Sequence, residues 1–213
     1  MTITTVGIDL AKNVFAVHCV DQNGKTVLVK SRVTHAALPG LIAGLPPCVI
    51  GMEACSGAHY WARLFRQYGH EPRLMAAKFV SPYRMAGKSG KNDAADAQAI
   101  CEAVRRPHMR FVPVKDESQQ AMQCLHRTRQ GFIEEKKATY NRLRGLISEF
   151  GVIAPQSTDA LRHMFSEQKS FLPLQVQQYV HDLLVHIDRI EDNIIEYDRF
   201  CPAWQKQITA VSD

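Results

Sequence analysis

Apolar and polar residues alternate along the first part of the chain in the manner of half-buried β-strands. This alternation predicts three strands, over residues 2–8, 14–20 and 25–33. The Asn23-Gly24 dipeptide lies between the last two and is a strong signal for a tight hairpin turn. We therefore expect a three-stranded antiparallel meander, with Asp9 in or near its first strand.

The next segments alternate between helical and strand-like patterns. We expect strands over residues 48–52 and 73–76, and helices over residues 35–43, 60–68 and 93–104. Glu53 directly follows the first of these strands, and Asn92 is placed to cap the last helix. A meander followed by alternating helix and strand is typical of an α/β domain with a mixed sheet flanked by helices.

Beyond an irregular segment, residues 107–116, the pattern is helical. Residues 117–150 are charged and contain no proline, which predicts one long helix. A second helix carries apolar residues spaced by three and four, the spacing of a coiled-coil seam. They are Val176, Val180, Leu183, Ile187, Ile190, Ile194, Tyr197 and Cys201. The sequence leaves two interpretations open, a helical hairpin that only packs on itself and a surface for dimerisation.

Length and composition agree with one core domain and an appendage. We place the domain at residues 1–108 and a helical arm at residues 109–213. No apolar run is long enough to cross a bilayer and no export signal is seen, so we expect no membrane association and a cytoplasmic location. The six cysteines show no CxxC spacing and are expected to be free thiols.

Charge is distributed unevenly along the 213 residues, whose formal net charge is +5. Lys and Arg outnumber Asp and Glu by 8 to 4 in residues 1–83 and by 13 to 8 in residues 84–150. Residues 151–213 are acidic, with 5 against 9. A basic N-terminal part suits a polyanionic partner such as nucleic acid, although solvated charged helices give a similar count.

Four carboxylates are candidates for chemistry. Asp9 and Glu53 each end an apolar strand, where an isolated charge would be costly unless it is paired or bound to a metal. Asp93 and Asp96 are three residues apart and therefore share one face of a helix. Asp93 alone is better explained as a helix-start residue, but the four together favour a site for Mg or Mn, which prefer oxygen ligands. Two such metals can support phosphodiester cleavage.

Basic residues near these carboxylates are candidates for contacts with nucleic acid. Arg84, Lys88 and Lys91 precede the Asp93 and Asp96 pair in a glycine-containing stretch and suit phosphate contacts, although a solvated loop is nearly as good an explanation. Lys12 lies near Asp9 and could approach a phosphate or neutralise the carboxylates. The basic track continues through Arg105, Arg106, Arg127 and Arg129.

Three motifs together resemble the DEDD-type transposases of bacterial insertion sequences and the related Piv-type DNA invertases. They are VGIDLAKNVFAVH around Asp9, IGMEACSGAHYW around Glu53 and GKSGKNDAADAQAI around Asp93 and Asp96. The resemblance implies an RNase H-like domain similar to the RuvC resolvase, with these four residues as catalytic ligands of Mg or Mn. It also implies DNA as substrate, in some members a guide RNA, and a second domain with a nucleophilic serine, which we expect to be absent here.

Two rival functions differ in class from the transposase. An actin-like or sugar-kinase-type ATPase also begins with a strand, GIDL and a hairpin, but its second phosphate-binding turn and its adenosine element are not found. A catalytically incomplete fragment would act only in nucleic-acid binding or dimerisation. For the transposase we expect DNA as partner, homo-oligomers formed through the arm, and association with the bacterial nucleoid.

Overall fold

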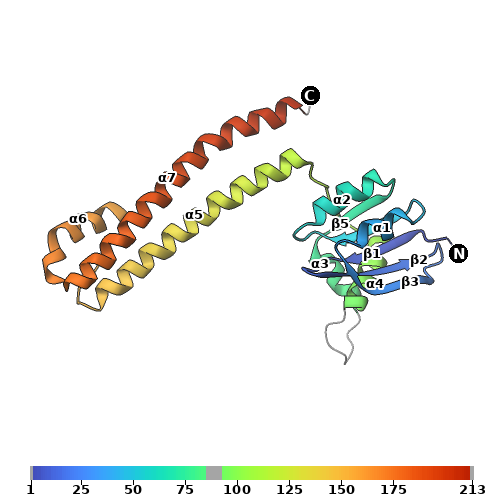
Figure 1. Ribbon diagram of the computed structural model, residues 1–213, viewed down its shortest axis with the longest axis horizontal. Coiled ribbons are helices and arrows are strands. Elements are labelled where there is room, and N and C mark those ends of the chain that lie inside the picture. The colour runs from blue at the N-terminus through green and yellow to red at the C-terminus, as the bar shows by residue number, and fades with distance from the viewer. Residues whose placement is uncertain (1, 85–92, 212–213) are drawn as a thin grey trace. The chain divides into compact units, whose positions relative to one another are not determined.

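The computed structural model describes residues 2–84 and 93–211, and the side chains of residues 93, 168, 169 and 201–211 are outside that description. The chain divides into two compact units, Met1–Asp116 and Glu117–Asp213 (Figure 1). The first unit holds β1 (Thr5–Asp9), β2 (Val14–Val20), β3 (Thr26–Thr34), α1 (Leu38–Ala43), β4 (Val49–Glu53), α2 (Ala58–Gln67), β5 (Glu71–Met75), α3 (Ala77–Val80), η1 (Ser81–Tyr83), α4 (Asp93–Val104) and β6 (Phe111–Val112).

One six-stranded sheet in the order β3-β2-β1-β4-β5-β6 forms the centre of this unit. Strands β1, β2 and β3 are antiparallel neighbours, whereas β4 and β5 run parallel to β1. The expected mixed sheet flanked by helices is therefore confirmed. The unit also includes residues 109–116, which the sequence analysis assigned to the arm, because β6 pairs with β5 at the sheet edge.

The turn between β2 and β3 is built by Asp21. Its carboxylate accepts hydrogen bonds from the backbone N–H groups of Asn23 and Lys25, at 2.9 and 3.0 Å, and Gly24 adopts a φ of 80°. The residue is buried, with 6% exposed. Turn amides satisfy the carboxylate, which makes its burial tolerable.

The two faces of the sheet are covered by different helices. Alternate residues of a strand point to opposite faces, and Val6 and Ile8 belong to the apolar core that contains α1 and α2. A second buried cluster joins α4 to Met75 and Val80 on the other face. Gly7, between Val6 and Ile8, therefore faces α4, and Asp9 at the strand end follows the same alternation.

The second unit is a helical hairpin with a short helix at its turn (Figure 1). Its helices are α5 (Glu117–Ser148), α6 (Thr158–Gln168) and α7 (Leu174–Val211). The pattern of apolar residues predicted α5 and α7 but not α6. Leu143 and Ile147 of α5 share a buried cluster with Leu161 of α6 and with Val180 and Ile187 of α7.

Ion pairs show that α5 and α7 run antiparallel. Arg129 contacts Asp198 at 2.5 Å, and further along α5 Lys136 contacts Glu191 at 3.6 Å. The predicted seam residues Val180, Ile187 and Ile190 are buried; supercoiling of the pair stays a prediction. Among the described residues, no helix combines the length and the apolarity needed to span a membrane.

Candidate active site

Two of the four candidate carboxylates end neighbouring parallel strands. Ile8 of β1 pairs with Met52 of β4, so Asp9 and Glu53 are the next residues at the same edge of the sheet. Both are partly buried and follow the strand alternation that places Gly7 and Gly51 on the α4 face. Desolvation raises the pKa of the nearby Cys55 thiol, and the negative charges of Glu53 and Asp9 raise it further. Asp9 and Glu53 are therefore both close enough to the Cys55 thiol to affect it electrostatically.

Two glycines let α4 lie directly on the sheet backbone. Gly7 and Gly51 are register partners on β1 and β4. A Cβ atom added at Gly7 would lie 2.5 Å from the backbone nitrogen of Cys101, and one added at Gly51 would lie 2.8 Å from the Cβ of Val104. Neither position accepts a larger side chain unless α4 moves away. The close approach brings the first turns of α4 towards the carboxyl ends of β1 and β4.

Arg84 joins the two sides of this site. Its Nη2 lies 2.9 Å from Oε1 of Glu53, and its Nε lies 2.9 Å from Oδ1 of Asp96. The side chains of Glu53 and Asp96 are only 15% and 14% exposed, whereas Arg84 is 38% exposed. Two carboxylates so close together repel each other unless a cation lies between them, and the planar guanidinium supplies that charge. The structure thus identifies a position where one cationic group is shared by β4 and α4.

The structure places the remaining site candidates as follows. Asp93 is the first residue of α4, and its side chain lies outside the described residues, as do Lys88, Lys91 and Asn92. Among the described side chains, no three His, Cys, Asp or Glu residues form a metal-binding group. Lys12 is exposed in the loop after β1, where its carbonyl oxygen accepts a hydrogen bond from His35 Nε2 at 3.1 Å.

Two arginines of the predicted basic track lie far along α4 from Asp96. Arg105 follows the last residue of the helix and donates a hydrogen bond to the carbonyl oxygen of Gln22 at 3.4 Å, in the β2–β3 turn. Arg106 pairs with Glu102. The β2–β3 turn lies where β1 begins, whereas Asp9 and Glu53 lie where β1 and β4 finish. The structure therefore does not bring these two arginines to the carboxylates.

The last two predicted basic residues belong to the helical unit. Arg127 and Arg129 lie on α5 and line a shallow surface hollow with His126. Arg129 is held by Asp198 through Nε at 2.5 Å and Nη2 at 3.3 Å. This ion pair offsets the charge of Arg129, so its first role is within the hairpin.

The pairing of Arg84 with the carboxylates was not predicted from the sequence, where this arginine was expected only to contact nucleic acid. Arg84 is 31 residues from Glu53 and 12 from Asp96, and no local pattern links the three. Arg84 does lie shortly before the DxxD motif, and that proximity in the chain was the one available signal.

A mixed sheet carries Asp9 and Glu53 at the carboxyl ends of adjacent parallel strands, and Asp96 near the start of α4 faces them through Arg84, which defines an acidic site. A family model described as "Transposase" (DEDD_Tnp_IS110) matches residues 6–151. The chain therefore belongs to the DEDD transposase family of the IS110 type.

Curated relatives agree with this family. The chain is 40% identical over 204 residues to "Probable family 20 transposase" of Pseudomonas aeruginosa, covering 93% of this chain and 59% of the relative. It is 37% identical over 198 residues to "Transposase for insertion sequence element IS1328" of Yersinia enterocolitica, covering 92% and 58%. A Coxiella burnetii protein, "Transposase for insertion sequence element IS1111A", is 39% identical over 150 residues, covering 70% and 40%. The chain thus spans less than two thirds of the length of these relatives.

Proposed function

We propose that this chain supplies the nuclease part of an insertion-sequence transposase that cuts and rejoins DNA with Mg or Mn. Asp9, Glu53, Asp93 and Asp96 are its proposed metal ligands. The single observation that carries the proposal is the pairing of Glu53 and Asp96 around one guanidinium, at 2.9 Å each, beside the strand end that bears Asp9. Family membership supports the same reaction.

The donor set fits a hard divalent cation. Its described members are carboxylates with oxygen donors, and Glu53 and Asp96 already share one cationic group. A pair of bound metals would activate the attacking oxygen and stabilise the leaving oxygen of a phosphodiester. The contribution of the chain is to hold the ligands on rigid elements, two strand ends and a helix that rests on Gly7 and Gly51.

The role of Arg84 follows from its position. Its guanidinium offsets one of the two negative charges of Glu53 and Asp96, and a metal that takes these ligands must displace it from at least one carboxylate. The released guanidinium would then be free to contact a phosphate oxygen, a partner that its fork geometry suits well. Arg84 is in this way both a stand-in for the metal and the nucleic-acid contact expected from the sequence.

The RNase H-like, RuvC-like fold is part of this proposal. It is supported by an antiparallel meander, β1 to β3, followed by β4 and β5 parallel to β1. Binding to a guide RNA is proposed from the family resemblance alone. Sequencing of RNA that copurifies with the chain tests it, and the absence of any enriched structured RNA would contradict it.

We also propose that copies of this chain associate through the helical unit. Phe171, Leu174 and Tyr179, near the turn of the hairpin, are 79%, 78% and 60% exposed. Large apolar side chains exposed in this way are candidates for contacts with another protein copy. Light scattering on wild type and on a Phe171→Ser, Leu174→Ser variant tests this: we expect an oligomer that the variant loses, and a wild-type monomer at micromolar concentration would refute the proposal.

A calorimetric titration with Mn tests the metal site. We expect binding in wild type and its loss in Asp9→Asn and Glu53→Gln. Glu71→Gln is the matched control, because Glu71 is 61% exposed and pairs with Arg73 on the surface of β5, away from the proposed ligands. Circular dichroism must show that all variants keep the fold.

The outcomes separate the rival functions. Equal Mn binding in wild type and Glu53→Gln, or none in either, would refute the carboxylate site and leave a module for nucleic-acid binding or association. Heat released on addition of ATP would instead support the ATPase.

A further inference from the structure

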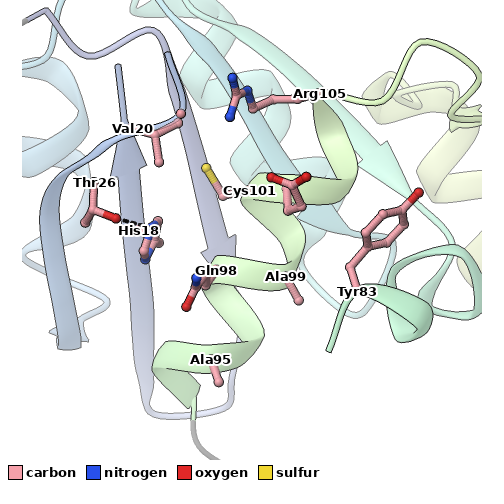
Figure 2. A pocket seen from close by; sticks show the side chains of 11 residues that line it. His18, Val20, Thr26, Tyr83, Ala95, Gln98, Ala99, Cys101 and Arg105 are labelled. Carbon is pink, nitrogen blue, oxygen red and sulfur yellow. Dashed lines mark hydrogen bonds between the residues drawn. The ribbon is translucent and has the colours of Figure 1, made fainter. Parts of the chain in front are cut away.

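A cavity lies between the α3–η1 segment and the residues that follow α4. Its volume is about 420 Å³, and its walls include Lys78, Phe79, Tyr83, Arg106, His108 and Arg110. Tyr83 is the residue before Arg84, whose guanidinium contacts Glu53 and Asp96. The walls of the cavity include none of Asp9, Glu53 and Asp96. Figure 2 shows a different pocket, in which Tyr83 lies beside α4 near Ala99 and which His18 and Thr26 also line. The cavity is thus separate from the carboxylate site but connected to it by one peptide unit.

The charge of the cavity is of one sign. Lys78, Arg106 and Arg110 line it together with His108, and no lining residue is an Asp or a Glu. The nearby carboxylate of Glu102 pairs with Arg106 from the preceding turn of α4. Both side chains of that pair are about half exposed, at 50% and 44%, so solvent screens it. A concave surface with this excess of cations attracts an anionic ligand.

Aromatic rings lie beside the cations. The guanidinium of Arg106 is 5.4 Å from the ring centroid of Tyr83, and Nζ of Lys78 is 5.0 Å from that of Phe79. A third pair follows at the neighbouring sheet edge, where Arg73 lies 5.1 Å from the ring centroid of Phe111. Cations over aromatic faces are a stable arrangement. Tyr83 and Phe79 are partly exposed, and a base that stacks on either ring must displace the cation from its face.

The ring of Tyr83 is fixed in position and can serve as a surface on which a base stacks. Its ring packs against the buried cluster of Met75, Val80 and Ile100, while the residue stays partly exposed. A fixed, partly exposed ring beside basic groups is the combination by which proteins bind single-stranded nucleic acid: bases stack on the ring, and Lys or Arg contacts the backbone phosphates. A base inside a duplex is stacked on its neighbours and cannot enter such a cavity.

We propose that this cavity binds one nucleotide of a single nucleic-acid strand, with its base on Tyr83 or Phe79 and its phosphate among Lys78, Arg106 and Arg110. The adjacent position of Arg84 would direct the neighbouring phosphate of that strand towards the carboxylates. Binding in the cavity itself needs no metal, so the inference goes beyond the proposed nuclease function.

Fluorescence anisotropy with a labelled twelve-nucleotide thymidine strand, in EDTA, tests the proposal. We expect Tyr83→Leu to weaken binding by about 5- to 150-fold, the loss of one stacked base, and Tyr83→Phe to keep wild-type affinity. Tyr60→Leu is the matched control, because Tyr60 is 53% exposed on α2, on the other face of the sheet.

A second variant tests the phosphate contact without touching the core. Arg110→Gln removes an exposed charge, and we expect the slope of log affinity against log salt to decrease by about 0.7. Arg66→Gln, an exposed arginine of α2, should leave the slope unchanged. Thermal melts of all variants exclude loss of fold.

Comparison of DNA and RNA strands in the same assay identifies which nucleic acid the cavity binds. Tighter binding of thymidine than of uridine strands identifies DNA, the reverse identifies RNA, and either supports the proposal. Equal effects of Tyr83→Leu and Tyr60→Leu, or duplex bound as tightly as single strand, would overturn it. Because the assay contains no metal, its failure is distinct from failure of the Mn titration, which tests the nuclease site alone.

Discussion

Replacement of Arg84 by glutamine should destabilise the metal-free protein and strengthen its binding of Mn. Arg84 makes two charge-assisted contacts of 2.9 Å, to Glu53 and Asp96. Each such hydrogen bond is worth about 1.5–3 kcal/mol when protected from water. Because Arg84 is 38% exposed, solvent screens both contacts, and we expect a total loss of about 1–3 kcal/mol in the free energy of unfolding.

This loss can be measured by thermal melts in EDTA. For a unit of this size, about 1 kcal/mol shifts Tm by about 4 °C, so Arg84→Gln should lower Tm by about 4–12 °C. Arg73→Gln is the control, since Arg73 pairs with a Glu71 side chain that is 61% exposed. A surface pair of this kind contributes about 0–1 kcal/mol, and the control should melt close to wild type.

The affinity for Mn should rise in Arg84→Gln, whereas the stability falls. Mn must displace the guanidinium in wild type but not in Arg84→Gln, so the variant should bind Mn about 5- to 150-fold more tightly, at about 1.4 kcal/mol for each tenfold. If Arg84→Gln melts like wild type in EDTA, or binds Mn more weakly, the reasoning is refuted. Arg84 would then be a group that orients the ligands with the metal in place.

Three further predictions concern the fold. Gly7→Ala should lower the free energy of unfolding by at least about 1–3 kcal/mol, because the added methyl group collides with α4. Gly40→Ala, in open space on α1, should raise it by about 0.5–1 kcal/mol. Equal melting temperatures of the two variants would contradict the packing of α4. Ile187 is fully buried in the hairpin, so Ile187→Ala should lower the free energy of unfolding by about 2–5 kcal/mol, measured by urea unfolding of the chain. Ile195 is half-exposed, and Ile195→Ala should lower it clearly less. Burial lowers the pKa of His18 below its ordinary 6.5, so its stabilising contribution is complete above pH 6.5 and decreases below it as the unfolded chain binds protons; His18→Gln should flatten that pH dependence, and an unchanged profile would contradict it.

The sheet and most helices could be predicted because their signals are local. Alternation locates β1 to β3, and the Asn-Gly turn sets the hairpin between the last two. The exceptions are short elements. β6 has two residues, Phe111 and Val112, too few for a period, and only its pairing with β5 makes it a strand. The helix α6 is amphipathic over few turns and is stabilised by Leu161, which is buried against the hairpin.

The site could be predicted only in its carboxylates. Asp9 and Glu53 stand out because charged residues at the ends of apolar strands need an explanation. The requirement for glycine at positions 7 and 51 depends on α4, which lies more than 40 residues further along the chain, and could not be read from either strand. The guanidinium between Glu53 and Asp96 depends in the same way on three elements meeting in space.

The contact of α4 with bare strand backbone has a consequence for how this fold can vary. Where a helix rests on side chains, exchange of one residue for a larger or smaller one shifts the helix by a fraction of an ångström. At Gly7 and Gly51 no side chain lies between helix and strand, so the separation is set by backbone atoms. Substitutions elsewhere in the core can therefore change the thermal stability of the protein, while the spacing of the acidic groups stays constant.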